Sequence, residues 1–403
     1  MAAVRNTKRR IAAAIATATT VALAVGAGAA LPAQAAQPEG RVLHAGAAEA
    51  VPGSYIVTLK ETSGFTASAA RGKRLIADHG GTIKRTYTSA LNGYAATLSS
   101  TEAERLAADP AVASVEQDQK VHSTATQTGA PWGLDRIDQT GLPLSGTYTY
   151  PDTGGSGATV YVLDTGVRIT HQEISGRASY GYDFVDNDST AQDGAGHGTH
   201  VATTVAGTTY GVAKKAKIVA VRVLGNDGSG TTAGVIAGVD WITANHVASS
   251  VANVSLGGGA STTLDNAVRR SIESGVTYSI AAGNSGALAS GYSPARVDTA
   301  LTVGATTRTD ARATYSNYGP VVDIFAPGSA ITAGWNTSDT ATYTGNGTSF
   351  AAPHVSGAAA VYLTSHPGAA PAAVASALVN GATPNVLTGV GTGSPNKLLK
   401  LVP

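Results

Sequence analysis

From residue 158 onward, short apolar runs alternate with segments in which apolar residues recur at helical spacing. The apolar runs cover 158–163, 217–224, 251–256, 276–282 and 300–304. Runs of this length without a polar face are typical of parallel strands that are covered on both sides. The segments between and after them predict helices over 200–206, 232–245, 264–274 and 349–365. This alternation predicts a doubly wound α/β domain around a parallel sheet.

The preceding part of the chain, from about residue 52 to 121, has a different pattern. Strands are predicted over 55–59, 81–87, 94–98 and 112–116, and helices over 66–78 and 100–109. Ser100 and Glu104 stand near the capping positions of the second helix, and Pro110 ends it. The order βαββαβ predicts a small α+β domain of the ferredoxin-like type. The polar stretch 117–128 shows no periodicity, which favours an exposed segment where the chain is cut.

The first 35 residues have the composition of a secretory signal peptide. Basic residues at positions 5–10 precede an apolar stretch over 11–31, and Ala33 and Ala35 provide small residues for cleavage. The alternative is a transmembrane anchor, but the stretch is rich in alanine and threonine and therefore weakly apolar. We expect a secreted, extracellular protein without a membrane segment once the signal is removed, and a mobile linker over 36–50.

Composition excludes some partners and stabilisers. The net charge of the 403-residue chain is +1, which gives no support for nucleic-acid binding. The chain has no cysteine, so an exported form cannot use disulfides. Bound calcium is a candidate for the missing stabiliser.

Three short segments carry the candidate chemistry, in the order acid, base, nucleophile. Asp164 follows an apolar run, His197 lies between two glycines where a helix begins, and Ser349 opens the last predicted helix. An aspartate that orients a histidine, and a histidine that takes the proton of a serine, make a nucleophile at neutral pH. Asn284 ends another apolar run, where its amide could stabilise an oxyanion.

Each of these residues also has an ordinary structural interpretation: a turn aspartate, a packed histidine, a helix-capping serine and a turn asparagine. A second Asp-Thr-Gly begins at Asp152, as in aspartic proteases, but the two copies are too close together for two separate lobes, so we assign Asp152 to a surface turn. His197 and His200 could suggest zinc, but no glutamate follows as in H-E-x-x-H. We expect His200 to make a structural hydrogen bond, and Gly196 and Gly198 to leave room for substrate and serine.

Together, these motifs resemble the subtilisin-like serine proteases (subtilases), specifically their secreted proteinase K branch. The matching segments are 162–166, 196–202, 255–259, 281–284 and 347–355. The resemblance covers essentially all of 125–403, and 53–121 resembles the family's inhibitory propeptide. It implies a signal over 1–35, a propeptide over 36–124 with an inhibitor-like domain over about 52–121, and a peptidase domain over 125–403. Phe350 stands beside Ser349 where the family usually has methionine. We expect this replacement to alter the sensitivity of the protein to oxidation and not to remove its activity.

The resemblance also implies substrate-binding residues. The peptide would lie between two edges as an added strand, and Thr232 would leave the more distant subsite open. A broad preference for small apolar to aromatic residues is expected. The two edges are Ser255, Leu256 and Gly257 on one side, and Gly228, Ser229 and Gly230 on the other.

Calcium is implied by the same branch. The carboxylate of Asp323 and the carbonyl oxygens of Asp298 and Ala300 would hold one ion. A second site from Asp135, Asp138 and Gln139 resembles one in some members, and ordinary surface acidity is the alternative for the two aspartates.

The resulting hypothesis is a secreted serine endopeptidase that acts through an acyl-enzyme on proteins and peptides. It would cut its own precursor between Thr124 and Ala125, and its propeptide would serve as inhibitor and folding template. We expect a monomer. The alternatives are an esterase and a catalytically dead subtilase fold that serves as a binding protein.

Overall fold

The computed structural model describes residues 40–47, 50–61, 65–121 and 123–402. They belong to two compact units, of which the larger contains residues 43–56 and 116–403. The predicted signal peptide and residues 36–39 and 48–49 of the predicted linker lie outside the described residues. Among the described helices, none is long and apolar enough to cross a membrane.

The small N-terminal domain confirms the predicted order βαββαβ. Its sheet has the strand order β2-β3-β1-β4. Leu75 and Ile76 of α1 are buried. The predicted cap of α2 is wrong: Ser99 and Glu102 form the capping box, in place of Ser100 and Glu104. The strands are β1 (Ala50–Leu59), β2 (Thr82–Tyr87), β3 (Gly93–Thr97) and β4 (Val112–Gln119), and the helices α1 (Ala70–Asp78) and α2 (Ser100–Ala107).

The polar stretch after this domain is more ordered than its sequence predicts. β4 continues to Gln119, and β5 (Thr124–Thr128) pairs antiparallel with β6 (Thr147–Pro151). Backbone hydrogen bonds to β6 hold β5, so this strand needs no apolar periodicity of its own. Part of the predicted linker is likewise fixed, because Leu43 pairs with Glu116.

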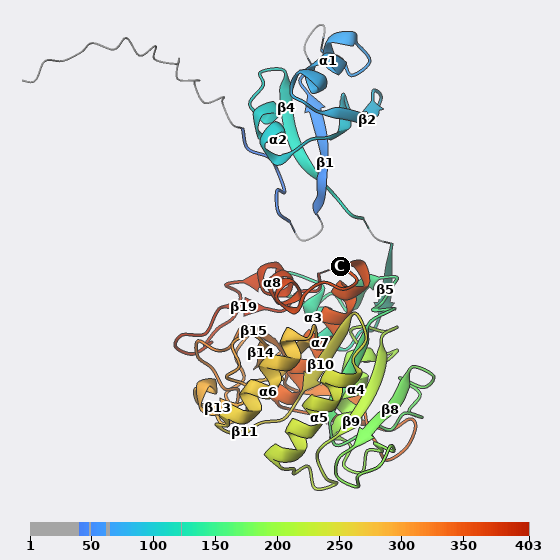
Figure 1. Ribbon diagram of the computed structural model, residues 1–403, viewed down its shortest axis with the longest axis vertical. Helices are drawn as coiled ribbons and strands as arrows, with labels where there is room; N and C mark the ends of the chain where they lie inside the picture. The colour runs from blue at the N-terminus through green and yellow to red at the C-terminus, as the bar shows by residue number, and fades with distance from the viewer. Residues whose placement is uncertain (1–39, 48–49, 62–64, 122, 403) are drawn as a thin grey trace, which may run out of the picture. The chain divides into compact units, whose positions relative to one another are not determined.

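The large unit is built on a nine-stranded sheet in the order β18-β19-β15-β14-β12-β10-β7-β9-β8 (Figure 1). All neighbours are parallel except β18 and β19. The predicted doubly wound fold is therefore confirmed. The strands are β7 (Thr159–Asp164), β8 (Ala178–Asp183), β9 (Lys217–Arg222), β10 (Ser250–Val254), β12 (Thr277–Ala281), β14 (Leu301–Thr306), β15 (Ile324–Pro327), β18 (Thr383–Pro384) and β19 (Lys397–Leu398).

Helices cover both faces of this sheet, as alternate residues of β7 show. Val160 and Val162 join the core under α4, α7 and α8, whereas Tyr161 and Leu163 join the core under α5 and α6. Both faces are apolar because successive strand residues point to opposite sides. The helices are α3 (Trp132–Ile137), α4 (His197–Ala206), α5 (Thr232–Asn245), α6 (Thr262–Glu273), α7 (Thr348–Ser365) and α8 (Pro371–Gly381).

The strand order reverses direction beside β7. The next strands along the chain, β8 and β9, lie on one side of β7, whereas β10 and the strands after it lie on the other. Crevices at such a switch point, outside the carboxyl ends of the strands, are the usual ligand sites of doubly wound sheets. Asp164 ends β7 and Ser255 follows β10, so both stand at this crevice. Short pairs near it are β11 (Gly258–Gly259) with β13 (Tyr292–Ser293), and β16 (Ile331–Gly334) with β17 (Thr342–Gly345).

Candidate active site

Asp164 and His197 are joined at the carboxyl end of β7. The Asp164 carboxylate is fully buried, and its Oδ1 lies 2.7 Å from His197 Nδ1 and accepts from the Thr165 N–H at 2.7 Å. His197 is the first residue of α4. Burial by itself lowers the pKa of His197, but the charge of Asp164, its hydrogen bond and the charge of Asp193 outweigh burial and raise the pKa above its ordinary value. An imidazole held in this way turns its Nε2 to the cleft.

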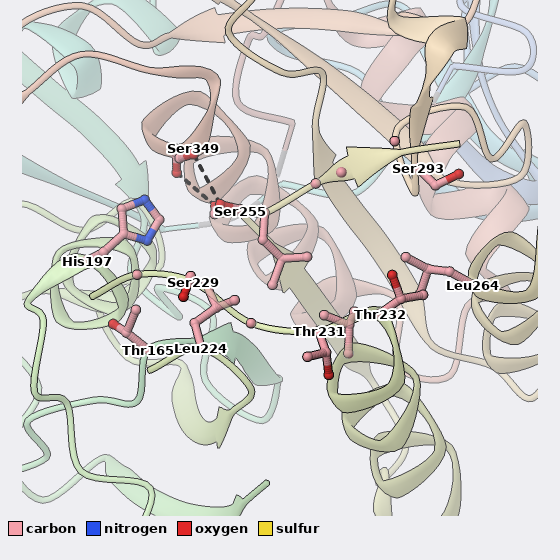
Figure 2. Close-up of a pocket in the computed structure, with 17 residues that line it drawn as sticks. Thr165, His197, Leu224, Ser229, Thr231, Thr232, Ser255, Leu264, Ser293 and Ser349 are labelled. Carbon is pink, nitrogen blue, oxygen red and sulfur yellow. Dashed lines mark hydrogen bonds between the residues drawn. The ribbon is translucent and has the colours of Figure 1, made fainter. Parts of the chain in front are cut away.

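Ser349 lies in the first turn of α7 and lines the same cleft as His197 (Figure 2). Its hydroxyl donates to the carbonyl oxygen of Ser255 at 3.1 Å. Within the described part of the chain, no hydrogen bond joins Ser349 Oγ to His197. Bonds between a nucleophile and its base are often long without substrate and tighten when it binds. The predicted acid, base and nucleophile are thus brought to one crevice.

A buried relay fixes the backbone of Ser349. Pro353 has no N–H to donate to the Ser349 carbonyl four residues earlier, and the Ser255 hydroxyl donates to that carbonyl instead, at 2.8 Å. Ser255 Oγ in turn accepts from Asn253 Nδ2, whose Oδ1 accepts from the Ser356 hydroxyl, both at 2.8 Å. The sequence offered no signal for this relay, because its members come from β10, the loop after it and α7.

Asn284 is oriented by the first residue of α7. Its Oδ1 accepts from the Thr348 N–H at 2.8 Å and from the Thr348 hydroxyl at 2.9 Å. This leaves the Nδ2 amide as a donor without a partner among the described residues. Asn284 and Ser349 both line a small cavity of about 170 Å³. The arrangement meets the requirement for an oxyanion site, a donor beside the nucleophile.

The cleft itself has a volume of about 530 Å³, and all six predicted substrate-binding residues line it. Thr232 also lines it and is exposed, which agrees with an open distant subsite. Sequence reasoning assigned no role to several apolar residues that line the cleft and the small cavity, because all of them except Ala281 lie outside the motifs. They are Leu224, Val235 and Leu264 in the cleft, and Ala281, Tyr292 and Ala295 in the small cavity.

The two glycines beside His197 are required for a different reason than predicted. Gly196 has φ +106°, and a Cβ there would lie 2.2 Å from the Trp335 indole. A Cβ at Gly198 would lie 2.0 Å from the Gly166 carbonyl oxygen. Both positions are therefore filled by the protein itself, and the expectation that they leave room for substrate is wrong.

His200 has the predicted structural role. Its Nε2 lies 3.1 Å from the Ile331 carbonyl oxygen, and burial lowers its pKa to about 3. The ring of Phe350 contacts both histidines, with centroids 4.2 Å from His200 and 5.5 Å from His197. Among the described residues, no cluster of three or more histidine, cysteine or acidic side chains could hold a metal. Asp152 is exposed in a turn, as predicted.

The surroundings of Asp323 suit a hard cation with oxygen ligands. Asp323 is partly buried, and its Oδ2 accepts from the Thr302 N–H at 2.8 Å. Burial raises the pKa of Asp323 to about 6, and no basic side chain pairs with it in the described part of the chain. The Asp298 carboxylate is exposed and pairs with Arg269 at 3.2 Å, so only the carbonyl of Asp298 is left as a ligand. An ion here would require the oxygens of Asp298, Ala300 and Asp323.

The second predicted cation site is largely filled by its own loop. Asp135 Oδ1 accepts from the N–H and the hydroxyl of Ser145, both at 3.0 Å, and Oδ2 accepts from the Gly146 N–H at 2.7 Å. The Gln139 amide donates to the carbonyls of Gly141 and Pro143. Asp138 Oδ1 is buried without a partner among the described residues, and burial raises the pKa of Asp138. These residues fit a cation less well than Asp323 does.

The predicted cut lies within a paired strand. Thr124 pairs with Pro151, and Ala125 with Tyr150, in the β5–β6 ladder. A protease that binds its substrate as an added strand needs a free segment. The Thr124–Ala125 bond would therefore have to leave β6 in order to be cut.

Comparisons with known proteins agree with this geometry. The model of the subtilase family matches residues 155–396, and that of peptidase inhibitor I9 matches residues 54–124. An extracellular serine proteinase of Thermus sp. (strain Rt41A) is 50% identical over 91% of this chain and 94% of its own. A cuticle-degrading serine protease of Arthrobotrys oligospora is 42% identical over 90% of this chain and 94% of its own. The crystal structure of a cold adapted subtilisin-like serine proteinase, 51% identical, matches with a TM-score of 0.67 over 68% of this chain and all of that protein.

Proposed function

This chain belongs to the subtilase family and is a subtilisin-like serine protease with an inhibitor-type N-terminal domain, and from that premise we propose that Asp164, His197 and Ser349 hydrolyse peptide bonds. The observation that carries the proposal is the 2.7 Å contact between His197 and buried Asp164 in the cleft that Ser349 lines. A binding protein without activity would not need a histidine held in this tautomer.

The reaction proceeds through an acyl-enzyme. Ser349 Oγ attacks the peptide carbonyl carbon, and its proton passes to His197 Nε2 while Asp164 holds Nδ1–H. The Asn284 amide and the Ser349 N–H donate to the oxyanion. His197 then gives the proton to the leaving amine, and a water molecule, activated in the same way, releases the acyl group. Esters are cleaved by the same steps, so an esterase activity accompanies the peptidase activity.

Substrates are proteins and peptides bound in extended form. The peptide lies between Ser255–Gly257 and Gly228–Gly230, and the side chain before the cleaved bond enters the small cavity beside Asn284. Its limited volume supports small apolar to aromatic residues there. The proposed setting is extracellular, which is supported by the names of the relatives and by the basic and apolar composition of residues 1–35.

The N-terminal domain acts as the inhibitor of its own enzyme until the bond between Thr124 and Ala125 is cut. Support comes from the match to peptidase inhibitor I9, which ends at residue 124. A parallel sheet with many distant contacts folds slowly, so the domain also acts as a folding template.

The test is the variant Ser349→Ala, expressed in a protease-free host. We expect uncut precursor of residues 36–403 to accumulate and labelling by a fluorophosphonate to be lost. Ser338→Ala, an exposed loop serine, serves as the control and should mature and label normally. Normal processing of Ser349→Ala would defeat self-cleavage, and a processed wild-type protein that the reagent does not label would favour the binding protein.

Subtilases generally bind calcium, and in this chain the ion stabilises the fold through Asp323 with the carbonyls of Asp298 and Ala300. The partly buried carboxylate of Asp323, which has no basic partner among the described residues, supports this set. A chelator should lower the melting temperature of wild type by several degrees, and Asp323→Asn should remove most of that response. Equal melting curves with and without chelator would exclude a stabilising ion.

A further inference from the structure

A second buried carboxylate, that of Asp193, joins the two chain segments that carry Asp164 and His197. Its Oδ1 accepts from the Thr165 hydroxyl at 2.9 Å and from the Gly196 N–H at 2.7 Å, the residues next to the acid and the base. The Thr165 hydroxyl accepts in turn from the Gly198 N–H at 2.9 Å. The position of the His197 backbone relative to Asp164 therefore depends on Asp193.

The need for this carboxylate follows from the start of α4. Gly196 occupies the N-cap position and has no side chain to cap the helix, and Trp335 leaves no space for one. Asp193 Oδ2 instead accepts from the Thr199 N–H at 2.9 Å and from its hydroxyl at 2.6 Å. Asp193 thus supplies, from outside the helix, the acceptor that a capping residue usually provides.

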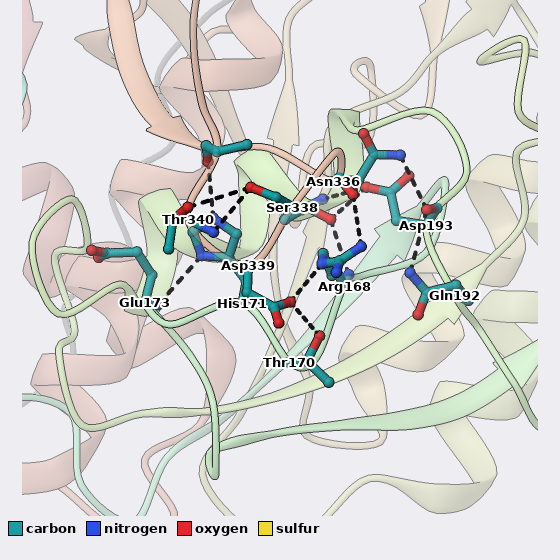
Figure 3. A network of polar contacts seen from close by, with 12 residues as sticks. Arg168, Thr170, His171, Glu173, Gln192, Asp193, Asn336, Ser338, Asp339 and Thr340 are labelled. Carbon is teal, nitrogen blue, oxygen red and sulfur yellow. Dashed lines mark hydrogen bonds and ion pairs between the residues drawn. The ribbon is translucent and has the colours of Figure 1, made fainter.

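The same carboxylate is a negative charge without a basic partner in the described part of the chain. Arg168 lies close by in the network of Figure 3, but its Nε pairs with Asp339 at 2.6 Å, and its Nη1 donates to the Asn336 carbonyl. Asn336 Nδ2 donates to the Asp193 backbone carbonyl at 3.1 Å and holds the loop in place. The charge of Asp193 is therefore stabilised by hydrogen bonds and by the positive end of α4, and not by a cation.

The groups around His197 determine how this charge acts. Asp164 approaches from β7 and Asp193 from the loop before α4, and the charges of both favour the imidazolium. His200 on α4 and His354 on α7 have pKa values lowered by burial to about 3 and about 4, so they are neutral at working pH. Removal of one of the two anions should weaken His197 as a base.

We propose that Asp193 is a positioning residue of the reaction, which fixes the geometry between Asp164 and His197 and adds a second negative charge in favour of the imidazolium. The inference rests on the proposed roles of Asp164, His197 and Ser349. It concerns a residue that touches neither substrate nor the reacting atoms.

The test compares three variants of the processed enzyme: Asp193→Asn, Thr165→Val and Thr165→Ser. The first keeps the shape of the side chain and removes its charge. The second breaks the link through the Thr165 hydroxyl and keeps the charge, and the third keeps a hydroxyl. For each, kcat and KM are measured with a chromogenic peptide from pH 5 to pH 10, together with the melting temperature.

For Asp193→Asn we expect kcat to fall about tenfold with KM unchanged. The midpoint of the acid limb of kcat/KM should move down by about 0.5 pH units, because a lost anion lowers the pKa of His197. Thr165→Val should lower kcat without moving the limb, and Thr165→Ser should restore kcat. A merely structural carboxylate would lower the melting temperature and leave the limb in place.

An unmoved acid limb in folded Asp193→Asn, or a raised KM with wild-type kcat, overturns the proposal. If Asp193→Asn does not fold, Thr165→Val decides: wild-type kcat in that variant overturns the proposal, and a loss that Thr165→Ser restores supports it. Fluorophosphonate labelling of wild type is measured first. Absence of labelling there would overturn the proposed function itself, independently of Asp193.

Discussion

The helices on the two faces of the sheet begin in different ways. On one face, α5 and α6 are capped by their own side chains: Thr231 Oγ1 accepts from the Gly234 N–H at 3.1 Å, and Ser261 Oγ from the Leu264 N–H at 3.4 Å. On the other face, α4 and α7 begin after glycines that provide no side-chain cap. His197 and Ser349 lie in the first turns of these two helices.

The difference shows what the catalytic helices gain from the lack of a local cap. The first donors of α4 are satisfied by Asp193 and Thr165, and the Thr348 N–H of α7 is satisfied by Asn284. Each acceptor thereby connects a helix start to another part of the crevice. A local cap would stabilise the helix just as well, but it would not fix the helix relative to Asp164 or aim the amide of Asn284.

The largest effect is expected where a distant cap also takes part in the chemistry. Asn284→Asp keeps the Oδ1 acceptor for the Thr348 N–H and loses the amide donor. We expect kcat to fall by 10²–10³-fold, about 3–4 kcal/mol, with little change in KM; this magnitude is the one known for an oxyanion-hole asparagine of subtilisin, a member of the same family. Steady-state kinetics on a peptide substrate measures it.

Asn284→Leu is the matched control, because it removes donor and acceptor together. It should lose kcat to the same extent and also lower the free energy of unfolding by about 1 kcal/mol, since the Thr348 N–H loses its acceptor. If Asn284→Asp retained kcat within threefold, Asn284 would only cap α7 and would take no part in the reaction. The cap of α7 would then serve the helix alone, as the caps of α5 and α6 do.

A smaller effect concerns the stability of the catalytic face in acid. Burial lowers the pKa of His200 on α4 to about 3 and that of His354 on α7 to about 4. In the unfolded chain both titrate near pH 6.5, so below that pH the unfolded state binds protons that the folded state does not. Above pH 6.5 both histidines are neutral in either state, and the free energy of unfolding does not depend on their titration. As the pH falls below 6.5, the free energy of unfolding decreases, by about 2 kcal/mol for each histidine at pH 5.

Urea unfolding of Ser349→Ala, which cannot digest itself, measures this dependence between pH 8 and pH 5. A second substitution, His354→Gln, keeps a side-chain amide near the Phe350 carbonyl, which His354 Nδ1 approaches at 2.8 Å. It should make the dependence on pH shallower. A free energy of unfolding that stays constant over this range would mean that protonation of His200 and His354 does not destabilise the folded state.

The same contrast explains what could be predicted from the sequence. The apolar strands β7, β10 and β12 and the helix α5 depend on local composition, and they were predicted within one or two residues. β8 was missed because its residues 178–183 are polar or small, and only its pairing with β9 makes it a strand. Asp164, His197, Ser349 and Asn284 could be proposed because each lies in a short motif.

Residues that act through distant partners left no such signal. Ser356 meets Asn253 across 103 positions of the chain. Trp335 explains Gly196 only when the fold brings them together, which is why the expectation for that glycine was wrong. Asp193 lies only four residues before His197, but nothing in its neighbourhood predicts that its carboxylate caps α4 and binds the Thr165 hydroxyl.

The smallest effect is expected on the face of the sheet without catalytic residues, where α5 and α6 are capped by their own side chains. Ser261→Ala removes the local cap of α6, and we expect the free energy of unfolding to fall by about 1 kcal/mol. Because the Ser261 hydroxyl bonds, among the described residues, only to the Leu264 N–H of its own helix, and no catalytic residue lies on α6, kcat and the pH profile should stay at wild-type values, unlike those of Asp193→Asn. Unfolding in urea and steady-state kinetics on one preparation decide the matter. A change in kcat of more than twofold would mean that local caps, too, are coupled to the active site. The two faces would then differ only in how far along the chain each capping residue lies from its helix, and not in what the caps do.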